Sequence, residues 1–263
     1  MSSVINFGRT LFAAALLGLI ASGHAHAANS ILIWPIDPVI ESDERATALW
    51  LENRGSTPAQ MQLRVLGWSQ KDGHDAYANQ SEVIGSPPMI RIAPGQKQLI
   101  RLTRTVDTPA GTERSYRVLI DEIPTQDPIA DGDKASVGIK FQMRYSVPLF
   151  VDGAGVWTKD RPEKKRDAKD ATRPALSWRT VVEDGKTLLE VRNTGVVHAK
   201  LAEVSFRHGE TRSVIAEGLL GYILPGNRMR WPLPEGAKPQ GELIAKINGT
   251  EALQTISAAS ASR

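Results

Sequence analysis

The chain has 263 residues, with 32 lysines and arginines against 29 acidic residues and no cysteine. The absence of cysteine excludes disulfides, thiol catalysis and zinc–thiolate or iron–sulfur centres. Because acidic residues are interspersed among the basic ones and no basic stripe occurs, neither nucleic-acid binding nor attachment to a membrane surface is indicated.

Residues 1–27 have the pattern of a secretory signal peptide. Arg9 precedes an apolar run at 11–21, and the small residues Ala25 and Ala27 offer a cleavage site. The run is too short to span a bilayer, which needs about 20 residues in a helix, so no membrane insertion is expected. We therefore expect an exported chain whose remaining length suits two domains of about 100 to 150 residues each.

Alternating apolar and polar residues predict β-strands from residue 31 onward. The runs at 47–52 and 61–68 alternate cleanly, whereas 71–81 is a polar stretch. Strand-like runs recur about every 10 residues, which is typical of a β-sandwich rather than of alternating strands and helices. No long segment after residue 30 keeps an apolar period of 3.6, so little helix is expected.

The longest alternating run lies at 137–147. Its apolar side chains fall on odd positions, and a strand places such residues on one face. These side chains either face the core of their own domain or fill the surface of a partner. The residues concerned are Val137, Ile139, Phe141, Met143 and Tyr145.

A charged segment separates two β-rich regions. Eleven of the sixteen residues at 158–173 are charged, which predicts a solvated loop or an interdomain surface segment. Short strands resume at about residue 176 and continue toward the C-terminus, with turns at 183–186 and 193–195. This pattern predicts a second, smaller β-sandwich.

Three motifs resemble periplasmic pilus assembly chaperones of the chaperone–usher pathway. Residues 87–102 contain a Pro-Pro pair, Arg91, a Pro-Gly turn and an Arg-Leu pair, in the order found in that family. Residues 116–124 resemble the F strand of the family, and 137–150 resemble its G strand. The three motifs occur in the family's order within a first domain of about 120 residues.

The resemblance implies an all-β fold of two immunoglobulin-like β-sandwich domains arranged as a boomerang. The expected limits are 28–151 for the N-terminal domain, 152–175 for a charged linker or loop, and 176–263 for the C-terminal domain. It also implies a periplasmic protein that binds pilus subunits by donor-strand complementation and delivers them to an outer-membrane usher without ATP or any cofactor. Whether free molecules self-associate through the donor-strand edge is left open.

The family carries a basic pair that anchors the C-terminal carboxylate of the subunit, and this sequence departs from that pattern. Asp37 stands where well-known members have an arginine, and their G-strand lysine falls at or near Ser146. Arg117 and Arg144 are the expected replacements, since guanidinium groups bind carboxylates bidentately. The alternative for either arginine is a surface ion pair. This substitution and the missing second-domain disulfide resemble the archaic branch of the family.

No catalytic or metal-binding residues are predicted. His74, His198 and His208 are isolated and lack metal-ligand spacing, and no nucleophile elbow of the serine hydrolases occurs. The stretch at 185–187 is similar to the end of a phosphate loop but lacks the upstream glycine, so a hairpin turn is expected there.

Two other classes of function remain open at this point. One is a secreted β-sandwich adhesin or carbohydrate- or protein-binding module, although the six tryptophans are dispersed rather than clustered. The other is a pilus subunit, which would have a single domain lacking one strand. The two predicted domains argue against the subunit.

Overall fold

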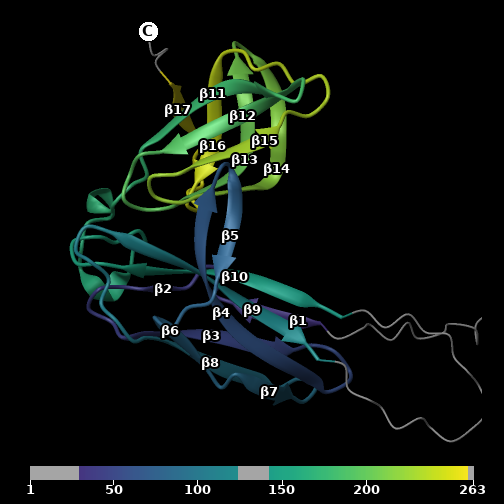
Figure 1. Ribbon diagram of the computed structural model, residues 1–263, viewed down its shortest axis with the longest axis vertical. Coiled ribbons are helices and arrows are strands. Elements are labelled where there is room, and N and C mark those ends of the chain that lie inside the picture. The colour runs from purple at the N-terminus through teal and green to yellow at the C-terminus, as the bar shows by residue number, and fades with distance from the viewer. Residues whose placement is uncertain (1–29, 124–141, 260–263) are drawn as a thin grey trace, which may run out of the picture.

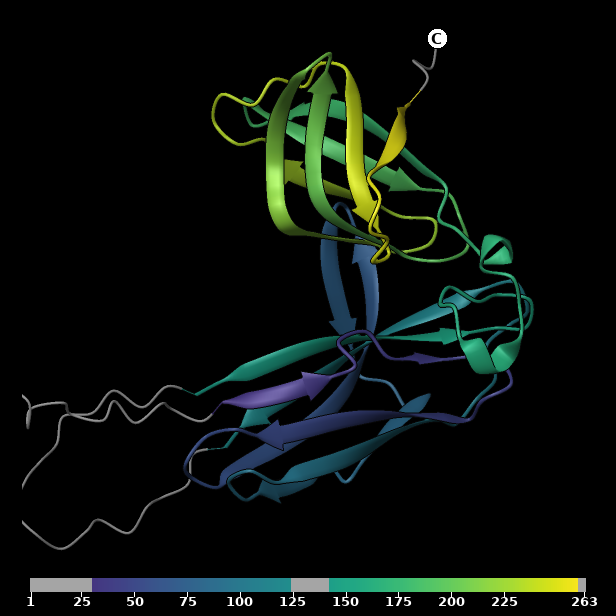
Figure 2. The same cartoon turned by 180° about the vertical axis from the view of Figure 1, so that it is seen from behind.

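The computed structural model describes residues 30–123 and 142–259. The strands form two sandwiches set at an angle to each other, joined on one side by the charged segment (Figure 1; Figure 2). The only helical elements among the described residues are the 3-10 turns η1 (Pro162–Lys164) and η2 (Ala168–Asp170). The predicted all-β fold of two sandwiches in a boomerang is therefore confirmed. Residues 1–29 lie outside the described part, so the signal peptide stays a prediction, as do the domain limits.

The first sandwich has two sheets with a shared core. One sheet runs in the order β1 (Ile31–Trp34), β3 (Ala46–Asn53), β8 (Lys97–Arg104) and β6 (Val83–Ser86). The other runs β2 (Val39–Ile40), β10 (Arg144–Asp152), β9 (Glu113–Glu122), β4 (Ala59–Lys71) and β5 (His74–Ala78), with β7 (Met89–Ile92) paired to β4.

Side-chain alternation explains how these sheets face each other. On β3, Leu49 and Leu51 are fully buried while Trp50 between them lies on the outer face, stacked on Trp34. The strands of the other sheet bury their alternate apolar residues against the same core. Each large apolar side chain buried in this way contributes roughly 1.5 to 3 kcal/mol, so the alternation drives the closure of the sandwich.

The second sandwich is made from one continuous sheet of seven strands. The order is β14 (Thr211–Ile223), β13 (Ala199–His208), β16 (Glu242–Ile247), β17 (Gln254–Ala258), β11 (Leu176–Glu183), β12 (Lys186–Asn193) and β15 (Arg228–Pro232). Strand β17 pairs with β16 on one side and with β11 on the other, so it joins the two layers. Leu189, Leu201 and Phe206 pack between the layers, and Asp184 and Gly185 form the expected hairpin turn between β11 and β12.

The polar stretch at 71–81 is more ordered than its composition suggests. It contains β5, which pairs with the end of β4 through a tight turn at Asp72 and Gly73. Both turn residues have positive φ, as a two-residue hairpin requires, and Asp-Gly is a strong sequence signal for such a turn. This hairpin reaches up to the second sandwich, where Gly73 bridges to Met229 of β15 (Figure 1).

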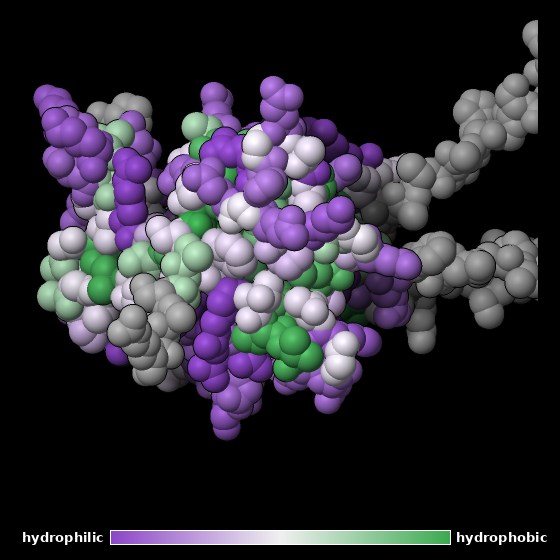
Figure 3. Space-filling view, turned by 90° about the horizontal axis from the view of Figure 1, so that it is seen from above, coloured by the Kyte–Doolittle hydropathy of each residue, from purple (hydrophilic) through white to green (hydrophobic). Residues whose placement is uncertain are grey.

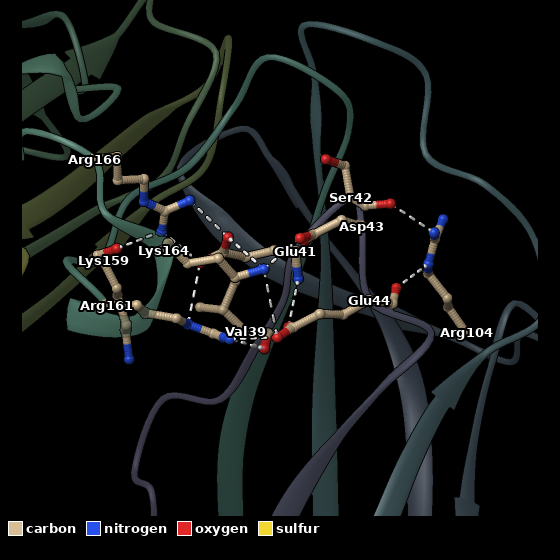
Figure 4. Close-up of polar contacts among 10 residues, drawn as sticks. All are labelled: Val39, Glu41, Ser42, Asp43, Glu44, Arg104, Lys159, Arg161, Lys164 and Arg166. Carbon is tan, nitrogen blue, oxygen red and sulfur yellow. Dashed lines mark hydrogen bonds and ion pairs between the residues drawn. The ribbon is translucent and has the colours of Figure 1, made fainter.

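The charged segment is held against the first sandwich by ion pairs rather than being simply solvated. The guanidinium of Arg166 binds both carboxylate oxygens of Glu41, at 2.6 and 2.7 Å (Figure 4). Arg161 donates to Glu44 at 2.6 Å, and Lys164 pairs with Asp43. These contacts join the acidic stretch before β3 to the linker, an arrangement that the two separate charge clusters in the sequence did not reveal.

Viewed from above, hydrophilic side chains cover most of the visible surface, and hydrophobic ones gather in small patches (Figure 3). No helix in the described parts of the chain is both long and apolar enough to cross a membrane.

Candidate functional site: the junction of the two domains

Aromatic side chains from both sandwiches meet where the domains join. Phe150 of β10 stacks on the ring of His198 in the second sandwich, with 3.4 Å between ring centroids. Trp68 of β4 meets Tyr222 of β14 edge-on at 5.5 Å. Together with Val39 these rings form a small apolar cluster separate from the two main cores, which fixes the contact between the sandwiches.

A buried glutamine of the first sandwich makes hydrogen bonds to the backbone of the second. The side-chain nitrogen of Gln70 donates to the carbonyl of Tyr222 at 2.9 Å, and its oxygen accepts from the amide of Leu224 at 2.8 Å. The carboxamide therefore pairs with the backbone of the second sandwich as a neighbouring strand would. Both bonds are buried, so losing this side chain would leave two backbone groups unsatisfied.

Arg117 lies at the same junction. Its guanidinium carbon is 3.8 Å from the centre of the Trp68 ring and 5.3 Å from that of Tyr222. Its Nε atom is buried and has no hydrogen-bond partner, and no carboxylate of the described residues lies within 4.0 Å of the group. A guanidinium held over aromatic faces without a counter-ion is well suited to bind a carboxylate.

Tyr222, which Arg117 contacts, also has charged neighbours from the linker and the second sandwich. Lys159 of the linker and Lys200 of β13 both approach Asp37, at 2.6 and 3.9 Å. Burial, followed by the nearby charge of Asp37, raises the pKa of Tyr222 to about 12, so this phenol stays neutral. Asp37 thus holds two lysines at the junction, although the sequence singled it out only as the residue that replaces an arginine.

Arg144 lies elsewhere. It is opposite Asp121 in the β10–β9 register, whereas Arg117 is opposite Pro148. Four residues along a strand correspond to about 13 Å, so the two arginines do not form one site. Arg144 shares the carboxylate of Asp121 with Arg64, which donates at 2.7 Å. Arg144 therefore lies in a surface ion pair, which was the alternative to a carboxylate anchor.

The predicted donor residues are only partly described. Val137, Ile139 and Phe141 lie outside the described residues, and their role stays a prediction. Met143 lies just before β10 and is 44% exposed. Tyr145, on β10, is partly buried and packs against the core of the first sandwich, as does the buried Val147 two residues later. The side chain of Tyr145 therefore faces the core of its own domain.

One edge of β10 is open. Residues 144–152 pair with β9 on one side, while β2 pairs on the other side only with Phe150 and Val151. Among the described strands, the stretch from Arg144 to Leu149 thus has a neighbour on a single side. An unpaired strand edge presents backbone N–H and C=O groups that another chain can pair with.

A buried acidic cluster lies beside the junction. Glu113 at the start of β9 accepts hydrogen bonds from the backbone amide of His198 at 2.9 Å and contacts its Nδ1 at 2.7 Å. Asp152 at the end of β10 is fully buried, and neither of its carboxylate oxygens has a hydrogen-bond partner. Burial, followed by the charges of Glu113 and Glu41, raises the pKa of Asp152 to about 8.

This raised pKa predicts a pH-dependent stability. An unfolded aspartate titrates near pH ~4, so between about pH 4 and pH 8 the native state holds a proton that the unfolded state has released. The free energy of unfolding therefore falls as the pH rises through this range, by up to about 1.4 kcal/mol per pH unit. We expect Asp152→Asn to flatten this dependence and to raise the free energy of unfolding above pH 8 by about 1 to 3 kcal/mol.

Urea unfolding between about pH 5 and pH 9 measures the effect. Asp160→Asn, at an exposed aspartate in the linker, is the matched control and should keep the wild-type dependence. An Asp152→Asn protein with the same slope as wild type would show that Asp152 is ionised in the native state.

His198, the only one of the three predicted isolated histidines that is buried, has a structural position between Phe150 and Glu113. Among the described residues, no group of three histidine, aspartate or glutamate side chains is arranged to hold a metal ion.

Comparisons with known proteins agree with this geometry. The family model for pili and flagellar-assembly chaperones, PapD N-terminal domain, matches residues 38–156. A solved complex of a chaperone with a tip adhesion subunit, CsuC–CsuE from the archaic chaperone–usher Csu pili of Acinetobacter baumannii, has 34% sequence identity and a TM-score of 0.70. The match covers 88% of this chain and 99% of that chain. The chain belongs to the pilus chaperone family.

More distant relatives of this chaperone share its fold. The E. coli chaperone DraB has 20% identity and a TM-score of 0.57, over 87% of this chain and 98% of that one. The complex of the Salmonella enterica pilin SafA with the chaperone SafB also has 20% identity and a TM-score of 0.57, over 85% of this chain and 91% of that one. The search of curated proteins gives no match. The family is one of chaperones and not of enzymes, and the predicted resemblance, including its archaic character, is confirmed.

The sequence did not indicate that several residues would lie at the domain junction. Trp68 and Gln70 looked like ordinary members of an alternating strand, and Tyr222 like one of many apolar strand residues. Their partners lie about 150 residues away, so only the folded chain brings them together. The missing arginine at Asp37 was the one departure from the family pattern that pointed to this region.

Proposed function

We propose that this chaperone holds pilus subunits in the periplasm by lending them the strand around β10, and that it passes them to an outer-membrane usher without ATP. The open edge of β10 is the observation that carries this proposal. A subunit that lacks one strand can pair its backbone with this edge and bury the alternate apolar side chains that precede it. Each such side chain contributes roughly 1.5 to 3 kcal/mol when buried.

Arg117 anchors the subunit by its C-terminal carboxylate in this proposal. It lies on the outer face of β9, opposite Pro148 of the donor strand, and it lacks a carboxylate partner among the described residues. Lys200 is opposite Tyr222 in the β13–β14 register, and Lys200 and Lys159 both lie within ion-pair distance of Asp37. A carboxylate placed there would bind the guanidinium in a water-poor setting between aromatic rings, which fixes the register of the subunit along β10.

Membership of the family supports the proposed location and onward partner. Pilus chaperones of this family are periplasmic, and the pattern at 1–27 is that of an exported chain. The A. baumannii relative belongs to a chaperone–usher system, which suggests an usher as the acceptor of the subunit. The domain limits of 28–151 and 176–263, with the charged segment between them, belong to the same proposal.

Co-purification tests the proposal. We expect an affinity-tagged chaperone isolated from periplasm to carry a pilus subunit, identified by mass spectrometry, in an equimolar complex. The complex should form and persist in nucleotide-free buffer, because strand pairing and apolar burial supply the binding energy. A tagged chaperone without any bound subunit, or a complex that needs added ATP to form, would refute the proposed mechanism.

A further inference from the structure

Two rows of polar side chains cross the outer face of β11, β12 and β15, which lie side by side in the second sandwich (Figure 1). In the first row Arg179, Glu190 and Arg230 are directly opposite one another on successive strands. In the next row Ser177 is opposite Arg192, and Arg192 is opposite Arg228.

The first row is electrically satisfied. Glu190 is 3% exposed, and its two carboxylate oxygens accept from Arg179 at 2.6 Å and from Arg230 at 2.7 Å. Arg230 also pairs with Glu183 at 3.2 Å. These contacts occupy both carboxylates, and they lower the pKa of Glu190 against the effect of its burial.

The second row is not satisfied. Arg192 is exposed and has no ion pair or hydrogen bond from its side chain within the described ranges. Arg228 reaches only the already occupied Glu190, at 3.7 Å. Directly opposed residues of neighbouring strands have Cβ atoms about 4.5 to 5.5 Å apart, and like charges at this separation destabilise the sheet. The two rows together carry four arginines against the carboxylates of Glu183 and Glu190.

The space beside these arginines is a cavity rather than a flat surface. Its volume is about 250 Å³, and its walls are formed by Ser177, Trp178, Arg179, Glu190, Arg192, Arg228 and Ala259. It therefore presents guanidinium groups from three strands and one hydroxyl group toward a common space, together with the carboxylate of Glu190, which Arg179 and Arg230 already pair with. Nothing among the described residues supplies the negative charge that this arrangement lacks.

We propose that this cavity binds a phosphate group. Phosphate monoesters carry about −1.5 to −2 charges at neutral pH, which matches the excess of two arginines over carboxylates. Guanidinium groups match the oxygens of phosphate geometrically, and the Ser177 hydroxyl donates a further hydrogen bond. The bound anion separates the charges of Arg192 and Arg228 and removes their repulsion. The site is formed by strands of the second sandwich, none of which contributes to the open edge of β10, so the proposal does not rest on subunit binding.

Thermal unfolding and equilibrium dialysis with inorganic phosphate test the site on the full chain. At constant ionic strength, replacing chloride by phosphate at 100 times its Kd should raise the Tm of the wild type by about 5 °C or more. The double variant Arg192→Gln, Arg228→Gln should lose this response and bind phosphate at least about tenfold more weakly, without a lower Tm in phosphate-free buffer, since a repulsion is removed. The control variant Arg91→Gln, Arg101→Gln removes two exposed arginines of the first sandwich and should respond like the wild type.

Vesicles distinguish the source of the phosphate. Sedimentation with vesicles that contain phosphatidic acid, a phosphate monoester, but not with phosphatidylcholine vesicles would assign the site to a lipid headgroup. Binding of free phosphate without sedimentation would assign it to a soluble phosphate compound. Either result supports the site if it is lost in the Arg192→Gln, Arg228→Gln protein. Equal phosphate responses in that variant and the wild type, or no response from either phosphate or vesicles, would overturn the proposal.

Discussion

Replacing Phe141 with aspartate should abolish recovery of a co-produced pilus subunit from the periplasm while the chaperone itself still folds. Phe141 is the central apolar residue of the run at 137–145, which the proposed mechanism inserts into the subunit. The change removes about 1.5 to 3 kcal/mol of apolar burial and adds the cost of placing a carboxylate in an apolar groove. A combined loss of at least about 4 kcal/mol corresponds to about a thousandfold weaker binding.

Subunit recovery by affinity purification measures the effect, and circular dichroism of the purified variant checks its fold. The matched control is Gln142→Asp, one position along the strand, because neighbouring side chains of a strand point to opposite faces. We expect the control to keep most of the bound subunit. Normal recovery with Phe141→Asp would rule out donor-strand insertion through this run, whatever its effect on the isolated chaperone.

Replacing Arg117 with glutamine should weaken subunit binding by about 2 to 5 kcal/mol, equivalent to a Kd at least about 30 times higher. The guanidinium is held between Trp68 and Tyr222 and has no carboxylate partner among the described residues, so its charge is available to a ligand. A glutamine keeps much of the side-chain volume but cannot form a charge-assisted pair with a terminal carboxylate.

Arg144→Gln provides the comparison for Arg117. Its guanidinium pairs with Asp121 on the surface, and such pairs contribute about 0 to 1 kcal/mol, so binding should change less than about tenfold. Titration of each variant with purified subunit gives the two values of Kd, and urea unfolding shows whether either change affects stability. Equal losses for the two variants would contradict the placement of the carboxylate at Arg117. A subunit extended beyond its natural C-terminus should be insensitive to Arg117→Gln.

Local patterns predicted much of the first sandwich and of the family. Strand alternation at 47–52 and 61–68 predicted β3 and β4, and the order of the motifs at 87–102, 116–124 and 137–150 predicted a pilus chaperone. The same reasoning passed over β5, because it has no large aliphatic residue and its residues are nearly all exposed on a hairpin that projects from the sheet. The local Asp-Gly pair indicates the turn, whereas the contact of the hairpin with Met229 depends on the other sandwich being in place.

The candidate site was predicted only in part. Arg117 lies at the domain junction as the carboxylate-anchor hypothesis requires, but the sequence also proposed Arg144, which the sheet register places about 13 Å farther along the strand. Each arginine lies in a strand of alternating apolar and polar residues, so the sequence pattern alone does not show which of them binds a carboxylate. What distinguishes them is the neighbouring strand, which brings Asp121 to Arg144 and Trp68 to Arg117.

The sequence by itself determined the strand pattern, the turns and the order of motifs, because these depend on residues close together along the chain. The tertiary structure decided which charges are paired. Arg117 lies over aromatic rings without a carboxylate among the described residues, Arg166 pairs bidentately with Glu41, and Arg192 lies opposite Arg228, and all three arrangements arise from strands and loops that meet only after folding. It also decided the protonation of Asp152, because burial beside Glu113 raises its pKa to about 8 and no feature of the local sequence indicates that burial.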